Sequence, residues 1–524
     1  MKLIHQQIRF FFKIVLFSFL CLSTINSNSQ TSSKKQKKAE EFFTIGYLQG
    51  ESKLYLDAIE NCTKAIEIYP KYTDAYFNRG CYLSELKKYN EALLDFNKVL
   101  EINPNYNSKI YFAIGCAHYY LNEYENALFY FNKTIELYPE FGEAYSNRGS
   151  TKNKLLDYDG AFIDFNKAIE LSPKESMAYY NRGCLLAELS KFSEAINDFD
   201  KSIEFNPNFS LAYFNRGCAK AELKFYKSAI LDFTKTIELN PNSEEAFYNR
   251  GCAQNEMKNY LLALEDFNSA IKINHNKKEA YYNRGLIYSE LNKYDEAILD
   301  FSKVIELNPN DTSVYYCRGN TYANLKEYEK AILDFNKAIQ LNPNYSKAYS
   351  NRGNTKYILN DYEGAIFDFN KAIELDPNDA INYYNRGSAN GELKNYKLGL
   401  EDLIKAIKLD SNYRDAYYYM GICYDKLNDT KTAISYYDKT IKIDPTLSEA
   451  YFNRGCDYAT MNKYKEAILD FNKYINLNPH FGKVYKNRGI CKASLNDKNG
   501  ACSDFKKAKE LGENLNMDIQ EYCK

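Results

Sequence analysis

Several residue types on which most enzymes and nucleic-acid-binding proteins rely are scarce or missing. The 524 residues include no tryptophan and only four histidines, so few side chains can transfer protons near neutral pH. Charge is balanced, with 68 Lys+Arg against 69 Asp+Glu, and no basic run is interleaved with aromatic residues. A C-x-x-C pair, an H-E-x-x-H helix and a glycine-rich phosphate loop are also missing. We therefore expect no enzymatic activity, metal ion, cofactor or nucleic-acid partner.

Long apolar runs are missing as well, except for one at the start of the chain. A positively charged start precedes the apolar run Ile14–Leu22, and Ser27 and Ser29 give a small-x-small pattern before Gln30. This order is typical of an export signal over residues 1–29. We expect a chain exported to a bacterial periplasm or secreted, with no membrane span once the signal is removed. Retention of the segment as an uncleaved membrane anchor is the alternative.

Proline is missing from every expected helix interior, because the chain is built on a repeat. All eleven prolines fall at position 32 of a 34-residue unit, where they end one helix and precede the next unit. A glycine at position 8 marks each unit. Every step between these glycines is 34 residues, except one of 35 between the second and third. The fourteen glycines are Gly46, Gly80, Gly115, Gly149, Gly183, Gly217, Gly251, Gly285, Gly319, Gly353, Gly387, Gly421, Gly455 and Gly489.

Each unit has the pattern of a helical hairpin. Apolar residues at positions 20, 24, 27 and 28 form one face of an amphipathic helix, here called helix B. An aromatic residue at position 4 and Leu or Met at position 14 lie on the preceding helix A. We expect a polar linker over 30–38, fourteen repeats over 39–515, and a tail over 516–524 that adds a partial capping helix.

The aromatic at 4, Gly at 8, Ala at 20, Phe at 24 and Pro at 32 resemble the tetratricopeptide repeat pattern over about nine-tenths of the chain. The resemblance implies an all-α, right-handed superhelical solenoid of about fourteen stacked helix–turn–helix repeats. It also implies that helix A lines the concave side, with positions 2, 5, 6, 9, 12 and 13 facing the groove. Arg at position 7 departs from the family, which more often has Leu there.

The arginines at position 7 occur only in repeats that also carry Asp at position 23. Eleven repeats have both residues and three have neither. This co-occurrence predicts an ion pair between helices A and B of one hairpin, rather than a basic lining for an acidic ligand. The arginines are Arg79, Arg148, Arg182, Arg216, Arg250, Arg284, Arg318, Arg352, Arg386, Arg454 and Arg488. Their partners are Asp95, Asp164, Asp198, Asp232, Asp266, Asp300, Asp334, Asp368, Asp402, Asp470 and Asp504.

Asparagine at position 6 is the main candidate for ligand contact. The row is similar to the asparagine ladder inside the repeat superhelix of O-linked N-acetylglucosamine transferases, which implies that the carboxamides grip an extended peptide. A carboxamide offers a donor and an acceptor and so matches one peptide unit. The alternative is that these amides bond neighbouring helices and hold the stack in register. The ten residues are Asn78, Asn147, Asn181, Asn215, Asn249, Asn283, Asn351, Asn385, Asn453 and Asn487.

Aromatic residues at position 5 would share this groove. Their rings beside amides would also suit stacking against sugars, so a glycan-binding scaffold is a second hypothesis, and plain packing is the simpler alternative. A self-assembling structural element is a third. The candidate residues are Tyr180, Phe214, Tyr248, Tyr282, Tyr316 and Tyr384. The lysine and asparagine of a carboxylate clamp do not occur together in one repeat.

Thirteen cysteines raise the question of disulfides. Six share position 9, where equivalent sites on stacked helices lie about 8–10 Å apart, beyond the roughly 7 Å Cα limit for a disulfide. We expect those six to remain thiols and only Cys491, Cys502 and Cys523 to be bridge candidates. The six are Cys81, Cys116, Cys184, Cys218, Cys252 and Cys456.

Overall fold

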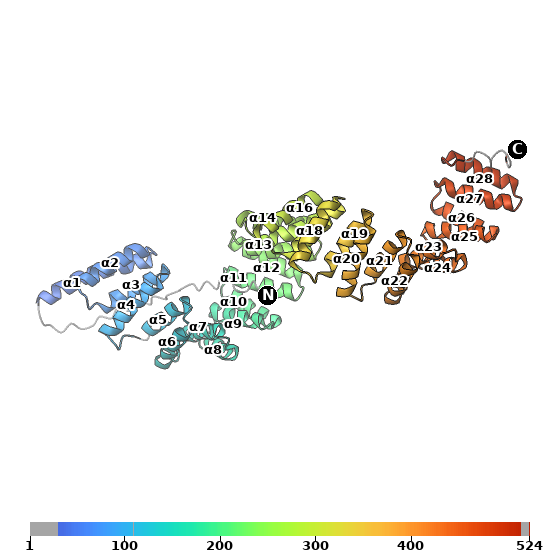
Figure 1. Ribbon diagram of the computed structural model, residues 1–524. Coiled ribbons are helices and arrows are strands. Elements are labelled where there is room, and N and C mark those ends of the chain that lie inside the picture. Colours follow the sequence, from blue (N-terminus) through green and yellow to red (C-terminus); the bar gives the residue numbers. More distant parts are fainter. Residues whose placement is uncertain (1–29, 108, 515–522, 524) are drawn as a thin grey trace. The chain divides into compact units, whose positions relative to one another are not determined.

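The computed structural model describes residues 30–107, 109–514 and 523 (Figure 1). The expected export signal and nearly all of the expected C-terminal tail lie outside these residues. The described residues form 28 helices and no strand. They divide into two compact units, Met1–His275 and Asn276–Lys524, each with fourteen helices.

In the first unit, odd-numbered helices are helix A of a repeat and even-numbered helices are helix B. The helices are α1 Gln30–Glu51, α2 Tyr55–Ile68, α3 Thr73–Glu85, α4 Tyr89–Ile102, α5 Lys109–Tyr120, α6 Tyr124–Leu137, α7 Gly142–Lys154, α8 Tyr158–Leu171, α9 Ser176–Glu188, α10 Phe192–Phe205, α11 Ser210–Glu222, α12 Tyr226–Leu239, α13 Glu244–Glu256 and α14 Tyr260–Ile273.

The second unit repeats the same alternation. The helices are α15 Lys278–Glu290, α16 Tyr294–Leu307, α17 Thr312–Asn324, α18 Tyr328–Leu341, α19 Ser346–Ile358, α20 Tyr362–Leu375, α21 Ala380–Glu392, α22 Tyr396–Leu409, α23 Arg414–Lys426, α24 Thr430–Ile443, α25 Ser448–Thr460, α26 Tyr464–Leu477, α27 Gly482–Ser494 and α28 Lys498–Glu510. Each described proline lies two residues beyond the end of a helix B, so the expected all-α solenoid of stacked hairpins is confirmed within each unit.

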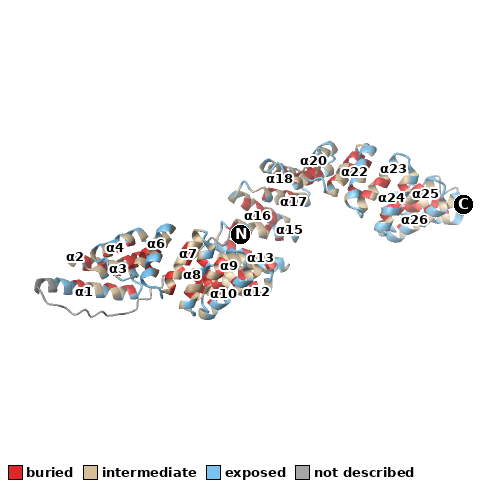
Figure 2. Cartoon of the chain, turned by 90° about the horizontal axis from the view of Figure 1, so that it is seen from below, coloured by how far each residue is buried: buried red, intermediate tan, exposed pale blue. Residues whose placement is uncertain are grey.

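The core of twelve of the fourteen hairpins is built from the glycine at position 8 and an aromatic ring at position 24; Cys62 and Leu403 take the place of the ring in the other two. Phe199 is fully buried, and a Cβ added to Gly183 would lie 2.8 Å from its Cε1 atom. Ala195, at position 20, is also fully buried. Only a missing side chain lets the ring reach helix A, which explains why glycine keeps this place. Figure 2 shows the buried residues concentrated where neighbouring helices face one another.

The first helix begins earlier than the sequence analysis predicted. Residues 30–38 were expected as a polar linker, but α1 starts at Gln30 and runs without a break to Glu51. The segment is rich in Lys and Gln, which both favour helices, and it contains no proline or glycine to stop one. The repeat pattern cannot detect this extension, because it begins only where apolar contacts recur.

The turn between helices A and B has a left-handed residue at position 15 of every repeat, and none of these residues is glycine. Their φ angles lie between 58° and 65°. The left-handed conformation costs an ordinary L-residue about 1–2 kcal/mol, but less for asparagine. The residues are Lys53, Lys87, Asn122, Leu156, Ser190, Lys224, Lys258, Asn292, Lys326, Asn360, Lys394, Asn428, Asn462 and Asn496.

Leu156 is the residue least suited to this turn, with φ 65° and 69 % of its surface exposed. We expect Leu156→Gly to stabilise α7 and α8 by about 1 kcal/mol, because strain is relieved and little packing is lost. Hydrogen exchange of these two helices measures the effect. Asn122→Gly is the matched control, and its change is expected to be smaller. A loss of protection in Leu156→Gly would contradict this account of the turn.

A disulfide joins Cys502 of α28 to Cys523, with 5.0 Å between the Cα atoms. It lies among the three cysteines expected to be bridge candidates, and the third, Cys491, remains a buried thiol. The bridge therefore ties Cys523 to α28 of the last repeat. No helix among the described residues is both long and apolar enough to cross a membrane.

Candidate functional site

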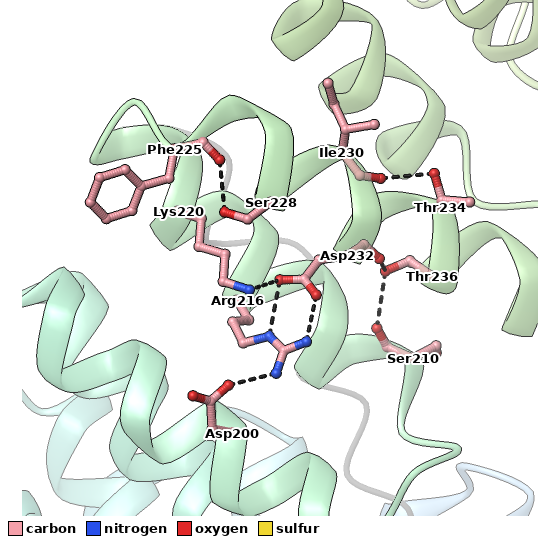
Figure 3. Close-up of polar contacts among 10 residues, drawn as sticks. All are labelled: Asp200, Ser210, Arg216, Lys220, Phe225, Ser228, Ile230, Asp232, Thr234 and Thr236. Carbon is pink, nitrogen blue, oxygen red and sulfur yellow. Dashed lines mark hydrogen bonds and ion pairs between the residues drawn. The ribbon is translucent and has the colours of Figure 1, made fainter.

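The arginine at position 7 binds the aspartate at position 23 of the same hairpin in all eleven repeats that carry both residues. Nε donates to Oδ2 at 2.7–3.0 Å, and Nη2 donates to Oδ1 at 2.5–2.8 Å. This two-pronged geometry is the strongest form of such a pair. The predicted pairing is confirmed, and Figure 3 shows it for Arg216 and Asp232.

The same guanidinium makes a third bond that the sequence analysis missed. In ten repeats Nη1 donates to the side chain at position 25 of the preceding repeat, at 2.5–3.0 Å. One arginine thus joins three helices, two of its own repeat and one of the repeat before. Figure 3 shows the bond from Arg216 to Asp200. The acceptors are Thr63, Asn132, Asn166, Asp200, Thr234, Ser302, Asn336, Asn370, Asp438 and Asn472.

Each paired arginine also lies over the aromatic ring at position 4 of its own helix. The Cζ-to-ring distances are 5.3–5.9 Å in all eleven repeats. Hydrogen bonds to Asp198 raise the pKa of Arg182, so its charge is permanent. Burial raises the pKa of Asp266, and Arg250 opposes that rise. These arginines hold the stack together and are not a lining for a ligand.

Seven of the ten asparagines at position 6 use their nitrogen to bond the preceding helix A. Nδ2 of Asn215 donates to Tyr180 Oη at 2.9 Å and to Cys184 Sγ at 3.4 Å. Nδ2 of Asn351 donates to Tyr316 Oη at 3.1 Å and to Asn320 Oδ1 at 2.7 Å. Such bonds link a candidate residue to the repeat before it.

The other asparagines divide into two groups. Five more reach the preceding helix A, and two donate within their own helix, Asn78 to the Asp74 carbonyl and Asn249 to the Glu245 carbonyl. Asn283 lies half-buried on α15. The five are Asn147, Asn181, Asn385, Asn453 and Asn487, with acceptors Cys116, Ser146, Asn354, Tyr418 and Cys456.

The carboxamide oxygens behave differently from the nitrogens. Leaving Asn283 aside, none of them accepts a hydrogen bond from the described residues, and none is an oxygen sealed from solvent without a partner. In seven of these residues the nitrogen anchors the amide on the preceding repeat, which fixes the direction of the oxygen. The result is a row of acceptor oxygens that the described residues leave unbonded; most of these asparagines are half-buried, and Asn78 and Asn181 are buried.

The aromatic residues at position 5 pack against helix B. The Tyr180 ring lies 6.0 Å from Phe199 and 4.7 Å from Phe209, and only 2 % of its surface is exposed. Burial raises its pKa well above the ordinary value. Four further rings lie against the helix B ring of their own repeat: Phe214 against Phe233, Tyr248 against Phe267, Tyr282 against Phe301 and Tyr316 against Phe335. Tyr384 lies instead against Tyr413, the residue just before α23. Tyr180 therefore offers little free face for stacking, whereas the other five rings are half-buried.

The position 9 cysteines also belong to this wall. Cys184 and Cys218 are thiols rather than disulfide partners, as expected from their spacing. Burial raises the pKa of both to about 12, so neither is a thiolate at neutral pH. Their role is to fill space and, for Cys184, to accept a bond from Asn215.

Comparison with known proteins identifies the repeat. Models described as "Tetratricopeptide repeat" match eleven segments that together cover well over half of the chain. The segments are 73–106, 108–141, 142–175, 176–209, 244–277, 279–311, 313–345, 346–379, 380–413, 415–447 and 448–481. None of the curated proteins compared matches the chain.

Solved structures of several repeat proteins are similar over part of the chain. YrrB, described as "a TPR protein with an unusual peptide-binding site", is 29% identical, with 35% of this chain and 95% of that one covered and a TM-score of 0.33. MamA is 30% identical, with 31% and 94% covered and a TM-score of 0.30. The C-terminal part of a repeat protein from Cytophaga hutchinsonii is 23% identical, with 46% and 98% covered and a TM-score of 0.41.

Proposed function

This chain belongs to the tetratricopeptide repeat family, whose members are typically protein-binding scaffolds, and we propose that it is an exported, non-enzymatic scaffold for extended segments of partner proteins. The observation that supports the proposal is the row of asparagine oxygens at position 6, which the preceding repeat orients through the amide nitrogen and which accept no hydrogen bond from the described residues, Asn283 aside. Backbone N–H groups of a guest are the natural donors to such a row.

The spacing of the row suits an extended chain. Packed helices lie about 8–10 Å apart, which is about three residues of extended peptide at 3.3–3.6 Å each. Each bond to a backbone N–H contributes only about 0.5–1.5 kcal/mol, so several repeats must act together. Such binding would depend on backbone conformation more than on the guest's side chains.

Export is part of the proposal. The chain starts with a segment of signal-peptide pattern, and Cys502 and Cys523 form a disulfide, which is typical of oxidising compartments. The mass of the chain recovered from its producing cells tests this directly, since removal of the signal leaves Gln30 as the first residue.

Peptide arrays and polysaccharide arrays, both incubated with the full chain, test the ligand class. We expect binding to extended peptides with loose sequence dependence. Binding to polysaccharides alone would instead favour the glycan hypothesis, in which Tyr248→Ala with Tyr282→Ala weakens binding. Size that grows with protein concentration, with no binding on either array, would favour a self-assembling element.

A further inference from the structure

Three consecutive helices B of the second unit turn large apolar side chains to solvent. The helices are α16, α18 and α20, and position 22 is Leu299, Leu333 or Phe367, with 70%, 67% and 66% of its surface exposed. A single exposed leucine is ordinary, but apolar residues that recur on neighbouring repeats form the kind of patch that marks an interaction site. The next repeat ends this patch, because position 22 there is Glu401, which is exposed.

Two arginines show that the three helices lie side by side. Arg318 donates to Ser302 of α16 at 2.9 Å and to Asp334 of α18 at 2.7 Å. Arg352 joins α18 to α20 in the same way. The bonded side chains stand at positions 25 and 23, close to position 22, so the exposed residues of the three helices belong to one surface.

Charged residues flank each of these apolar residues in the same order. Position 18 carries an acid and position 26 a lysine, so each helix presents an acid, an apolar residue and a lysine four residues apart along one face. The acids are Asp295, Glu329 and Glu363, all exposed, and the lysines are Lys303, Lys337 and Lys371. These six residues, together with Leu299, Leu333 and Phe367, are here called the outer patch.

The chain itself makes little use of the charges in the outer patch. Lys303 and Lys371 each reach a glutamate of their own helix at 2.6 Å, but the side chains of these pairs are 32–67% exposed, and such pairs contribute little to stability. Among the described residues, none of the three acids forms an ion pair. Both kinds of charge are therefore available to a partner.

The order of the charges makes the outer patch complementary to a second copy of itself. A two-fold axis through Leu333 reverses both the order of the repeats and the direction of the helices. It sets Leu333 against Leu333, Leu299 against Phe367, and each acid of one copy against a lysine of the other. We propose that the outer patch is the interface of a two-fold symmetric dimer of this chain, closed by an apolar centre between two rows of opposite charges.

The first unit carries a similar but poorer patch on α4, α6 and α8. Position 22 is Leu94, Phe129 or Ile163, but position 18 of α4 is Asn90 instead of an acid. Lys133 also lies over the Phe129 ring at 5.5 Å, which covers part of the apolar surface and occupies the charge. The dimer is therefore assigned to the outer patch of the second unit.

The area of the outer patch sets the expected affinity. Each of the three helices has 14 residues and is about 21 Å long, and helices packed about 8–10 Å apart would span about 25–30 Å. A dimer would bury about 500–600 Å² on each copy, or about 1,000–1,200 Å² in total, which is the lower limit for a specific interface. We expect a dissociation constant in the micromolar range.

Sedimentation velocity of the full chain, over a concentration series that brackets the micromolar range, tests the proposal. We expect a reversible increase in size that stops at the dimer. Leu333→Glu is expected to raise the dissociation constant at least about tenfold, because it sets two carboxylates against each other on the axis. The variant is expected to fold, since Glu401 already occupies this position in repeat 11.

Leu469→Glu is the matched control. It makes the same change at position 22 of repeat 13, where the leucine is 68% exposed but positions 18 and 26 are both lysine. Because this leucine lies outside the outer patch, the dissociation constant is expected to stay unchanged.

An exchange of charges tests the two-fold pairing itself. Glu329→Lys and Lys337→Glu are each expected to prevent the dimer, because like charges then face each other twice across the axis. A mixture of the two variants is expected to form the dimer again, because every lysine of one chain then faces a glutamate of the other. Misfolding cannot imitate this result, since the mixture associates only if both chains are folded.

The proposal is overturned if the chain stays monomeric, if it grows beyond a dimer, or if Leu333→Glu associates as well as the unchanged chain. A mixture of the two charge variants that remains monomeric would also overturn it. None of these results bears on peptide binding, because the outer patch lies on helices B and the candidate asparagines lie on helices A.

Discussion

Replacing Arg250 by leucine is expected to destabilise the hairpin of α13 and α14 by about 3–5 kcal/mol, because Asp266 would keep its buried charge without a partner. The two side chains are joined at 3.0 and 2.7 Å and are only 21% and 7% exposed. Adding Asp266→Tyr is expected to restore part of this loss. Hydrogen exchange of the two helices and urea unfolding of the full chain measure both effects.

The rescue is expected to be partial for a structural reason. Arg250 also donates to the Thr234 hydroxyl of the preceding repeat at 3.0 Å, and the double variant lacks this bond between repeats, although Thr234 still donates to the Ile230 carbonyl. The chain itself contains the apolar replacement, since repeat 3 carries Ile114 with Tyr130 at these two positions.

The control is an exposed ion pair. Lys201→Ala breaks the contact with Glu204, whose side chains are 53% and 57% exposed, and a loss below about 1 kcal/mol is expected. Losses that simply add in the Arg250 and Asp266 variants would contradict the coupling of the two residues.

Most of the fold could be predicted because the boundaries of nearly every repeat are marked by residues at fixed positions. Prolines at position 32 and glycines at position 8 fix the register, and Phe199 over Gly183 shows the packing that makes the glycine necessary. The pairing of Arg182 with Asp198 was predictable because the two residues appear and disappear together. When two positions change together from repeat to repeat, a single sequence is enough to predict that their side chains are in contact.

Other features of the structure correspond to no recurring pattern in the sequence. The acceptor at position 25 varies among Thr, Asn, Asp and Ser, so the bond from Arg182 to Asn166 has no fixed partner type to detect. The left-handed turn at Leu156 lacks the glycine that normally reveals it. The extension of α1 to Gln30 depends on helix propensity alone, since no repeat precedes it.

The sequence predicted which residues form the candidate site, but not which end of each asparagine carboxamide faces the groove. Sequence left two readings open for Asn215, a bond to the neighbouring repeat or a bond to a guest. In the structure each end of the side chain fits one of these interpretations. The nitrogen donates to Tyr180 and Cys184 of the preceding repeat, while the oxygen accepts no hydrogen bond from the described residues. A carboxamide has two different ends, and its sequence letter does not say which end faces the groove.

This division makes a sharp test of the row possible. Changing Asn181, Asn215 and Asn249 together to alanine is expected to weaken binding of an array-selected peptide by at least about tenfold, since three bonds of about 0.5–1.5 kcal/mol are lost. Ala113 already occupies this position in repeat 3, so the stack tolerates the change. Fluorescence anisotropy of a labelled peptide measures the affinity.

Asn249 separates binding from stability. Its nitrogen donates to the Glu245 carbonyl of its own helix, so Asn249→Ala alone removes a hydrogen bond within one helix, whereas Asn215→Ala removes two hydrogen bonds between repeats. If the oxygens hold the guest, both single variants weaken the peptide to a similar degree, while only Asn215→Ala lowers the protection of α9 and α11 in hydrogen exchange. Asn97→Ala, on the exposed side of α4, is the control and is expected to change neither. Unchanged peptide affinity in the triple variant would mean that these asparagines only hold neighbouring repeats together. If their oxygens bound the guest, the loss of three of them would lower its affinity.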